Sequence, residues 1–235
     1  MKKLQIKLLI ISLFAASLLC FGVINIVFAE HQKNSEKNNV WFRWAFGALL
    51  GNENNRKLVS ISRDTQLKTG DQFKMMVEMK KKCFIYLIYH GGQGELQLLF
   101  PDTVERFPDN YKTPERHYIP QGDLWFALDE NTGLEKFYLL ASAKRLTRLE
   151  ALLNNYKSVG SVEKKDLSAK IIKEIKQLKR QHRKFQAVAE RPVSIGGTVR
   201  GVTKDPKAPV HDIVSIAVEI SAADFYSRTF TIEHE

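Results

Sequence analysis

The chain has 235 residues and a formal net charge of +10 at pH 7, and its two cysteines are Cys20 and Cys83. So few cysteines exclude an exported domain that is held together by a disulfide framework. The charge is concentrated in residues 163–185, where nine Lys and Arg residues accompany three acidic ones, so it gives no reason to expect a nucleic-acid partner.

The N-terminus has the three parts of a secretory signal. Three lysines precede a long apolar stretch, which ends in the cleavage-site sequence VFA at Ala29. We predict a signal peptide over residues 1–29 and a periplasmic or secreted mature chain of 235 − 29 = 206 residues. The alternative is an inner-membrane anchor, because roughly 20 apolar residues suffice to cross a bilayer. The bulky Leu19 disfavours a lipoprotein acylated at Cys20.

Residues 40–51, with the sequence VWFRWAFGALLG, carry four aromatic side chains after a polar run. We expect this segment to pack on the domain, because a strand that is apolar on both faces needs a cover for its second face. The alternatives are a seat at a membrane interface, where aromatic rings are favoured, and a docking surface for a partner protein.

Two patterns predict neighbouring strands in the first half of the chain. Gln72–Met79 alternates, which predicts a half-buried strand with Phe73, Met75, Val77 and Met79 on its apolar face. Cys83–Tyr89 is apolar at nearly every position, which predicts a central strand covered on both faces, next to a strand at Leu96–Phe100. Cys83 is expected to be a small buried hydrophobe. Further strands are expected at residues 124–128, 135–142, 193–199, 213–220 and 228–233.

The sequence His90-Gly91-Gly92 between two of these strands is the one stretch that resembles catalytic machinery. In esterases such a loop supplies backbone N–H donors beside a serine in a G-x-S-x-G turn. No G-x-S-x-G sequence occurs in the chain. The glycines therefore predict a hairpin turn, in which they supply positive φ angles.

Two helices are predicted after these strands. Thr147-Arg-Leu-Glu150 has the form of a capping box, which predicts a helix to about Lys157. A second helix is predicted from about Asp166, with a stripe formed by Leu167, Ile171, Ile175 and Leu178. We expect the basic face of residues 166–185 to be solvated, and the alternative is contact with a membrane surface or an acidic partner.

The remaining residues that could carry chemistry form no recognisable site. Residues 196–201 lack the lysine of a P-loop and the spacing of a dinucleotide fingerprint. The histidines are scattered, without an H-E-x-x-H pair or paired cysteines, at His31, His90, His117, His182, His211 and His234. We therefore predict no catalytic, cofactor-binding or metal-binding residues and no cofactor.

Several short signatures in a fixed order resemble a bacterial family, the domain of unknown function, family four-three-eight-four. They are Leu67-Lys-Thr-Gly70-Asp71, Phe84-Ile-Tyr86-Leu87, Leu98-Leu99-Phe100-Pro101-Asp102, Tyr118-Ile119-Pro120, Phe126-x-Leu128, and Thr132-Gly133-x-Glu135 followed by Leu139-Leu140-Ala141-Ser142. The resemblance implies an exported or membrane-attached protein, and the family has no established reaction. The chain departs from the family pattern at Cys83, which stands for glycine, and at Asp102, which stands for asparagine.

These observations predict a mainly β fold, an antiparallel β-sandwich with a helical insertion of two helices, preceded by the signal peptide. Residues 30–56 are expected to form a polar linker and the aromatic segment, and residues 57–235 the sandwich domain. Within it we expect a family-like core at 57–146, the helical insertion at 147–185 and returning strands at 193–235.

We expect a non-enzymatic bacterial cell-envelope protein, a binding or accessory module whose partner is another envelope protein or envelope component. One alternative is a hydrolase whose catalytic groups converge only in the fold. The other is a membrane-tethered interaction protein that uses residues 40–51 or the basic helix at 166–185.

The order of the signal elements predicts that the mature chain begins at Glu30. Mass spectrometry of the protein isolated from cell envelopes checks this prediction. A chain that still begins at Met1 would contradict it in favour of a retained anchor, and a lipid on Cys20 would contradict it in favour of a lipoprotein.

Overall fold

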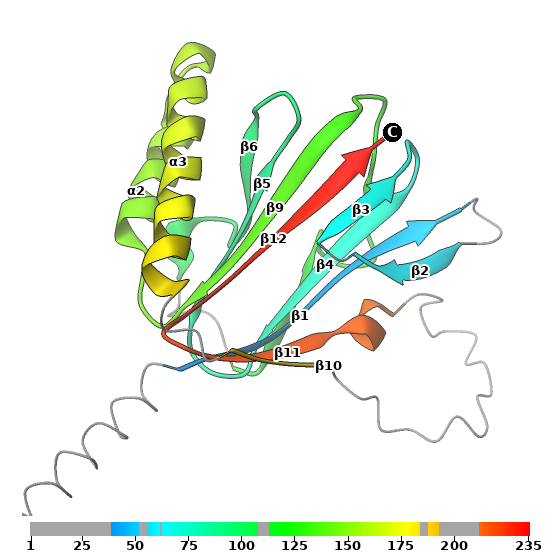
Figure 1. Cartoon of the computed structure of the whole chain (residues 1–235), viewed down its shortest axis with the longest axis horizontal. Coiled ribbons are helices and arrows are strands. Elements are labelled where there is room, and N and C mark those ends of the chain that lie inside the picture. Colours follow the sequence, from blue (N-terminus) through cyan, green and yellow to red (C-terminus); the bar gives the residue numbers. More distant parts are fainter. Residues whose placement is uncertain (1–38, 52–55, 62, 108–112, 184–187, 193–211) are drawn as a thin grey trace, which may run out of the picture. The chain divides into compact units, whose positions relative to one another are not determined.

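Two β-sheets and a helical hairpin make up most of the described part of the chain, which begins at residue 39 (Figure 1). The computed structural model describes residues 39–51, 56–61, 63–107, 113–183, 188–192 and 212–235. The predicted signal peptide at 1–29 and the strand predicted at 193–199 lie outside the described residues, and so do the glycine-rich segment 196–201, His31 and His211.

The two sheets face each other as a sandwich, which confirms the predicted fold class. We name the first one sheet A, which has the strand order β10 (Val188–Pro192), β11 (Val218–Ala223), β1 (Asn39–Leu50), β4 (Gln72–Met79) and β7 (Glu115–Ile119), with β2 (Lys57–Ser60) on β1 and β8 (Phe126–Ala127) on β4. Sheet B has the order β3 (Asp64–Leu67), β12 (Phe225–His234), β9 (Gly133–Ser142), β5 (Phe84–His90) and β6 (Leu96–Phe100). Neighbouring strands are antiparallel except β3 and β12, which are parallel.

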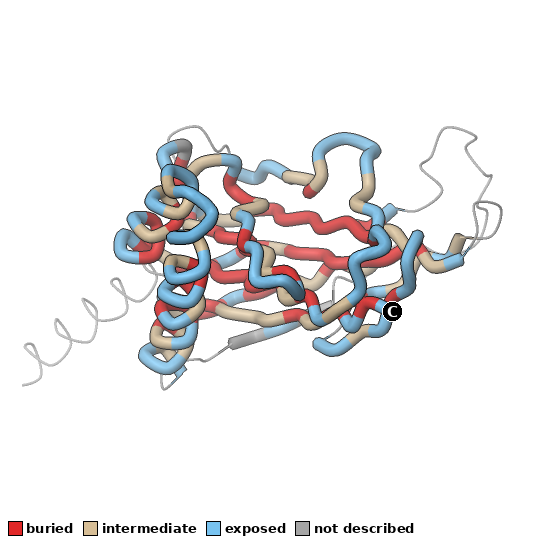
Figure 2. Tube along the Cα trace, turned by 90° about the horizontal axis from the view of Figure 1, so that it is seen from above, coloured by how far each residue is buried: buried red, intermediate tan, exposed pale blue. Residues whose placement is uncertain are grey.

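The aromatic segment expected to cover the sandwich is a strand within it. β1 lies between β11 and β4, so the aromatic segment belongs to sheet A itself. Phe46 on this strand packs edge-to-face against Phe137 and Phe230 of sheet B, with ring centroids 5.1 Å apart in both pairs. Such aromatic pairs stabilise a core beyond the area they bury. Figure 2 shows the buried residues as runs along the strands between the two layers.

β4 has the predicted bounds but is buried on both faces, and not on one face as its alternation indicated. Met76 on the second face packs with Ile213 and Ala217. Ile213–Ile216 forms a short 3-10 helix, η3, whereas a strand was predicted over residues 213–220. The Asp212 carboxylate accepts a hydrogen bond from the Val214 N–H group at 2.9 Å, which caps this turn and delays the strand until Val218.

β5 is covered on both faces, as predicted, although it lies next to the edge strand β6 and not at the centre of its sheet. Ile85 and Leu87 enter the core between the sheets, and Tyr86 and Ile88 face the helices. Cys83 is buried, as expected, and burial raises the pKa of its thiol to about 12. The thiol is therefore protonated and unreactive at neutral pH.

The helical hairpin consists of α2 (Thr147–Ser158) and α3 (Ser161–His182) and packs on the outer face of sheet B (Figure 1). Three of the four residues predicted for the stripe of α3 are buried, namely Ile171, Ile175 and Leu178. Leu167 is only partly buried, and the helix begins at Ser161 and not near Asp166. None of the helices in the described part of the chain combines the length and the apolar character that crossing a bilayer requires.

The capping box predicted for α2 does not form, because Glu150 binds elsewhere. Its carboxylate accepts hydrogen bonds from the Tyr86 hydroxyl at 2.5 Å and from Arg145 Nε at 2.9 Å. The Tyr86 hydroxyl in turn accepts a hydrogen bond from the Leu146 N–H group at 3.0 Å. One buried hydroxyl on β5 therefore fixes the start of α2 against sheet B.

We predict that Tyr86→Phe lowers the free energy of unfolding by about 1–3 kcal/mol, because it leaves the buried Leu146 N–H group without its acceptor. Urea denaturation measures the change. Tyr118→Phe is the matched control: its hydroxyl hydrogen bond to Arg116 is exposed, so it should cost less than about 0.5 kcal/mol. Equal losses in the two variants would contradict the structural role of Tyr86.

Candidate functional site

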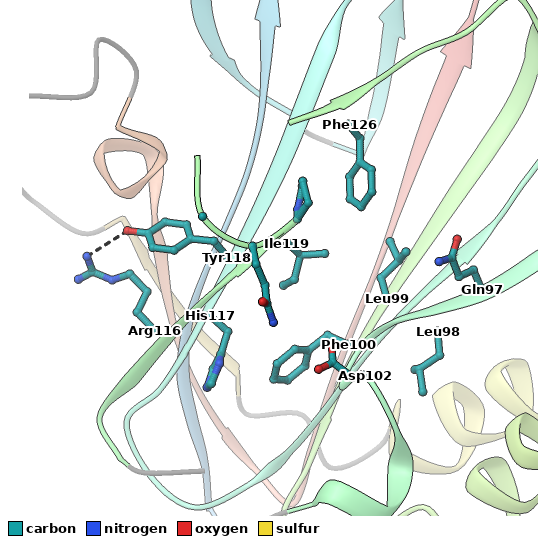
Figure 3. A pocket seen from close by; sticks show the side chains of 13 residues that line it. Gln97, Leu98, Leu99, Phe100, Asp102, Arg116, His117, Tyr118, Ile119 and Phe126 are labelled. Carbon is teal, nitrogen blue, oxygen red and sulfur yellow. Dashed lines mark hydrogen bonds between the residues drawn. The ribbon is translucent and has the colours of Figure 1, made fainter. Parts of the chain in front are cut away.

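An open groove lies where the edges of the two sheets diverge (Figure 3). β6 ends sheet B and β7 ends sheet A, and the groove between them has a volume of about 880 Å³. Its lining comes from β6, β7, β8 and the loops that follow β6 and β7: Gln97, Leu98, Leu99, Phe100, Asp102, Arg116, His117, Tyr118, Ile119, Pro120, Gln121, Gly122 and Phe126.

The floor of this edge groove is apolar and its rim is polar. Figure 3 shows Leu99, Ile119 and Phe126 around the space between the strands, with Arg116 and Tyr118 directed outward. A smaller recess of about 180 Å³ adjoins the groove, since Gln97, Leu99 and Phe126 line both. Ligand sites commonly combine apolar surface with polar groups that orient the ligand, and this groove has both, although its exposed surface is more polar than apolar.

Lys74 of β4 holds the loop that forms one wall of the groove. Its ammonium donates hydrogen bonds to the carbonyl oxygens of Gly122 and, at 2.9 Å, of Leu124. The same ammonium lies 5.2 Å from the centre of the Tyr118 ring, close enough for a cation–π interaction. Burial lowers the pKa of Lys74, and nearby Asp123 partly opposes this. The loop is therefore tied to the sheet and shapes a fixed wall.

His117 is the group in the groove with proton-transfer chemistry near neutral pH. It lies on β7, half-buried, with its ring centroid 5.2 Å from that of Phe100. Burial lowers its pKa below the ordinary value of 6.5, and the charges of Glu115 and Asp102 partly oppose this. The neutral imidazole is therefore the favoured form at pH 7.

The groove lining offers little for covalent catalysis. The thirteen described residues that form it include no serine, threonine, cysteine or lysine, and one carboxylate, that of Asp102. Nucleophilic catalysis needs an activated hydroxyl, thiol or amine, and glycoside hydrolysis needs two carboxylates.

The sequence His90-Gly91-Gly92 is part of the hairpin between β5 and β6, as predicted. The Gly91 N–H group donates to the Glu95 carbonyl at 3.0 Å. The expected positive φ occurs at Gly94, where φ is 90°, and not at Gly91 or Gly92. His90 lies beside α3, away from the groove. Among the residues that the structure describes, no three His, Cys, Asp or Glu side chains gather in a way that could hold a metal ion.

No prediction from the sequence placed a groove here, because the signatures that contain Pro101 and Pro120 were interpreted only as marks of a family. The sequence signal for the groove is the repetition of an aromatic or aliphatic residue before proline, at Phe100-Pro101 and Ile119-Pro120. Both sequences stand at the ends of edge strands, one at the end of β6 in sheet B and the other at the end of β7 in sheet A. The packing of the two sheets brings both ends to the same groove.

A family model with the description Domain of unknown function (DUF4384) matches residues 66–145. This segment is similar to the DUF4384 family. The match agrees with the resemblance drawn from the short signatures, and every residue of the groove lies inside the DUF4384 segment. Comparison with curated proteins and comparison with solved structures gave no match.

We predict that the free energy of unfolding falls as the pH is lowered from 7.5 to 5.0, in part because His117 is neutral in the folded chain. Because the folded pKa is depressed, the unfolded chain binds more protons in this range, and acid therefore favours unfolding. Denaturant unfolding of the wild type and of His117→Gln at both pH values measures the effect. The variant should lose less stability on acidification, and equal losses would contradict the prediction.

Proposed function

We propose that this chain is an exported, non-catalytic module of the bacterial cell envelope, and that its edge groove binds an extended peptide segment of another envelope protein. The signal peptide predicted at residues 1–29 and the exported or membrane-attached character that the family resemblance implies support the location. The groove supports the binding role.

The observation that carries the proposal is that the DUF4384 segment by itself supplies all of the groove. Leu98–Asp102 comes from one sheet and Tyr118–Pro120 from the other, and the two signatures meet only in the folded domain. Residues that only terminate strands are not expected to line the same groove. A shared binding surface would explain why both signatures contribute to it.

The strand edges on both sides of the groove favour an extended peptide as the ligand. β6 and β7 are each paired on one side, so each presents backbone N–H and C=O groups toward the opening. An added strand binds through such groups, and its alternate side chains enter pockets that give specificity. The recess beside Phe126 and Phe137 provides such a pocket for an apolar side chain.

A hydrolase that uses His117 is the second candidate, because this histidine and Asp102 both line the groove and their charges interact. In this role His117 would act as a general base on water, since the lining contains no serine, threonine, cysteine or lysine. The membrane-tethered alternative has support of a different kind, since the basic side chains of α3 form a cluster outside the groove.

In-cell photo-crosslinking tests the peptide-binding proposal. A photoreactive residue at Gln97 or at Gln121, both exposed in the lining, should crosslink the same envelope protein, and one at Gln181 on α3 should not. A peptide made from the crosslinked segment should bind the purified chain. Fluorescence anisotropy then compares Q97R/Q121R with Q66R/Q181R, which makes the same two changes away from the groove.

We expect the groove variant to weaken peptide binding at least tenfold, because two long cationic side chains occupy the opening, and the control to bind as the wild type does. Adducts at neither groove position, or equal binding by both variants, would contradict the proposal. Turnover in a screen of ester and peptide substrates that His117→Gln abolishes and His90→Ala leaves intact would favour the hydrolase.

A further inference from the structure

A second pocket lies outside the DUF4384 segment, on the far side of sheet B from β6. It has a volume of about 540 Å³, within the roughly 300–1,000 Å³ typical of small-molecule sites. Its walls are the C-terminal half of α3, the residue before β3, and parts of β10 and β12. Six cationic side chains line this basic pocket: Arg63, Lys176, Lys179, Arg180, Arg183 and Arg228.

One carboxylate, that of Glu190, accompanies these six cations in the lining. It forms an ion pair with Arg228, Nη1 to Oε2, at 3.0 Å, and it also accepts a hydrogen bond from the Tyr226 hydroxyl at 3.1 Å. Within the part of the chain that the structure describes, this is the one ion pair that involves a cation of the pocket. Glu190 therefore neutralises one charge and leaves an excess of positive charge.

Lys179 shows the consequence of that excess. Its ammonium is half-buried and donates a hydrogen bond to the Thr229 hydroxyl oxygen at 2.8 Å, a neutral partner. Burial lowers the pKa of Lys179, and the positive charge of Arg63 lowers it further. Cations gathered without counter-charges repel one another, and a bound anion would relieve the repulsion.

The open edge of β12 adds uncharged donors to the same pocket. β3 pairs with β12 only from Thr231 onward, and the Thr231 N–H group donates to the Arg63 carbonyl. Because strand amides alternate in direction, the N–H groups of Ser227 and Thr229 point to that same edge, at positions before the first residue of β12 that pairs with β3. Ser227 and Thr229 both line the pocket. Backbone amides beside guanidinium groups are a recurrent arrangement at anion sites.

We propose that the basic pocket binds a phosphate-bearing ligand, either a soluble phosphorylated molecule or the headgroup of an anionic lipid. Four of the six cations are arginines, whose planar forks match phosphate oxygens in bidentate fashion. Three separate elements converge to place them, which distinguishes the pocket from the solvated outer face of a basic helix. The site is independent of the edge groove, because its residues all lie outside residues 66–145.

Calorimetric titration of the purified full-length chain with pyrophosphate at physiological ionic strength tests the proposal. Lys176 and Arg180 are exposed, so K176Q/R180Q should fold normally and weaken binding at least tenfold. K144Q/K170Q is the matched control, since it removes the same two charges from exposed positions outside the pocket. It should bind pyrophosphate within twofold of the wild type.

Vesicle sedimentation identifies the source of the phosphate. Binding to phosphatidylglycerol vesicles that pyrophosphate displaces supports the site with a lipid headgroup as ligand. Pyrophosphate binding without such displaceable vesicle binding supports the site with a soluble ligand. The proposal is overturned if the wild type binds neither probe, or if both double variants weaken binding equally, since bulk charge alone would then explain the attraction.

Discussion

Sheet B is apolar on both faces, and much of the architecture follows from this constraint. Ile85 and Leu87 on one face of β5 require the opposing sheet, and Tyr86 and Ile88 on the other face require a second cover. β1 and its neighbours provide the first cover and the α2–α3 hairpin provides the second. The hydrogen bonds that join buried Tyr86 and Glu150 to the more exposed Arg145 then fix where the hairpin begins. A sheet with two apolar faces cannot be stable without both layers.

The two pockets are consequences of how these layers end. Where β6 and β7 diverge, the sandwich stays open and the edge groove results. Where β3 stops short of the full length of β12, α3 and β10 approach the exposed edge and the basic pocket results. The first lies wholly within the DUF4384 segment and the second wholly outside it. The chain therefore combines a groove lined by the family segment with a pocket lined by residues outside it.

Strands with strong local patterns were predictable, and those that depend on their neighbours were not. Gln72–Met79 was predicted with its observed bounds because its alternation is regular. The burial of its second face was not predicted, because the residues that cover this face belong to η3, more than a hundred residues away in the sequence. The capping-box prediction at Thr147 failed for a related reason. Glu150 bonds to Tyr86, a residue on a distant strand, and local sequence gives no sign of it.

The sequence by itself determined the fold class, the main strands of the DUF4384 segment, the two helices and the hairpin at His90. Each of these rests on periodicity, turn residues or short signatures within a few tens of residues. Only the tertiary structure decided that residues 39–50 form an inner strand, that the proline-containing signatures share a groove, and that cations of α3 converge with Arg63 and Arg228. These features depend on which strands become neighbours. Strand pairing between distant segments is set by the burial of the whole core, which no local pattern encodes.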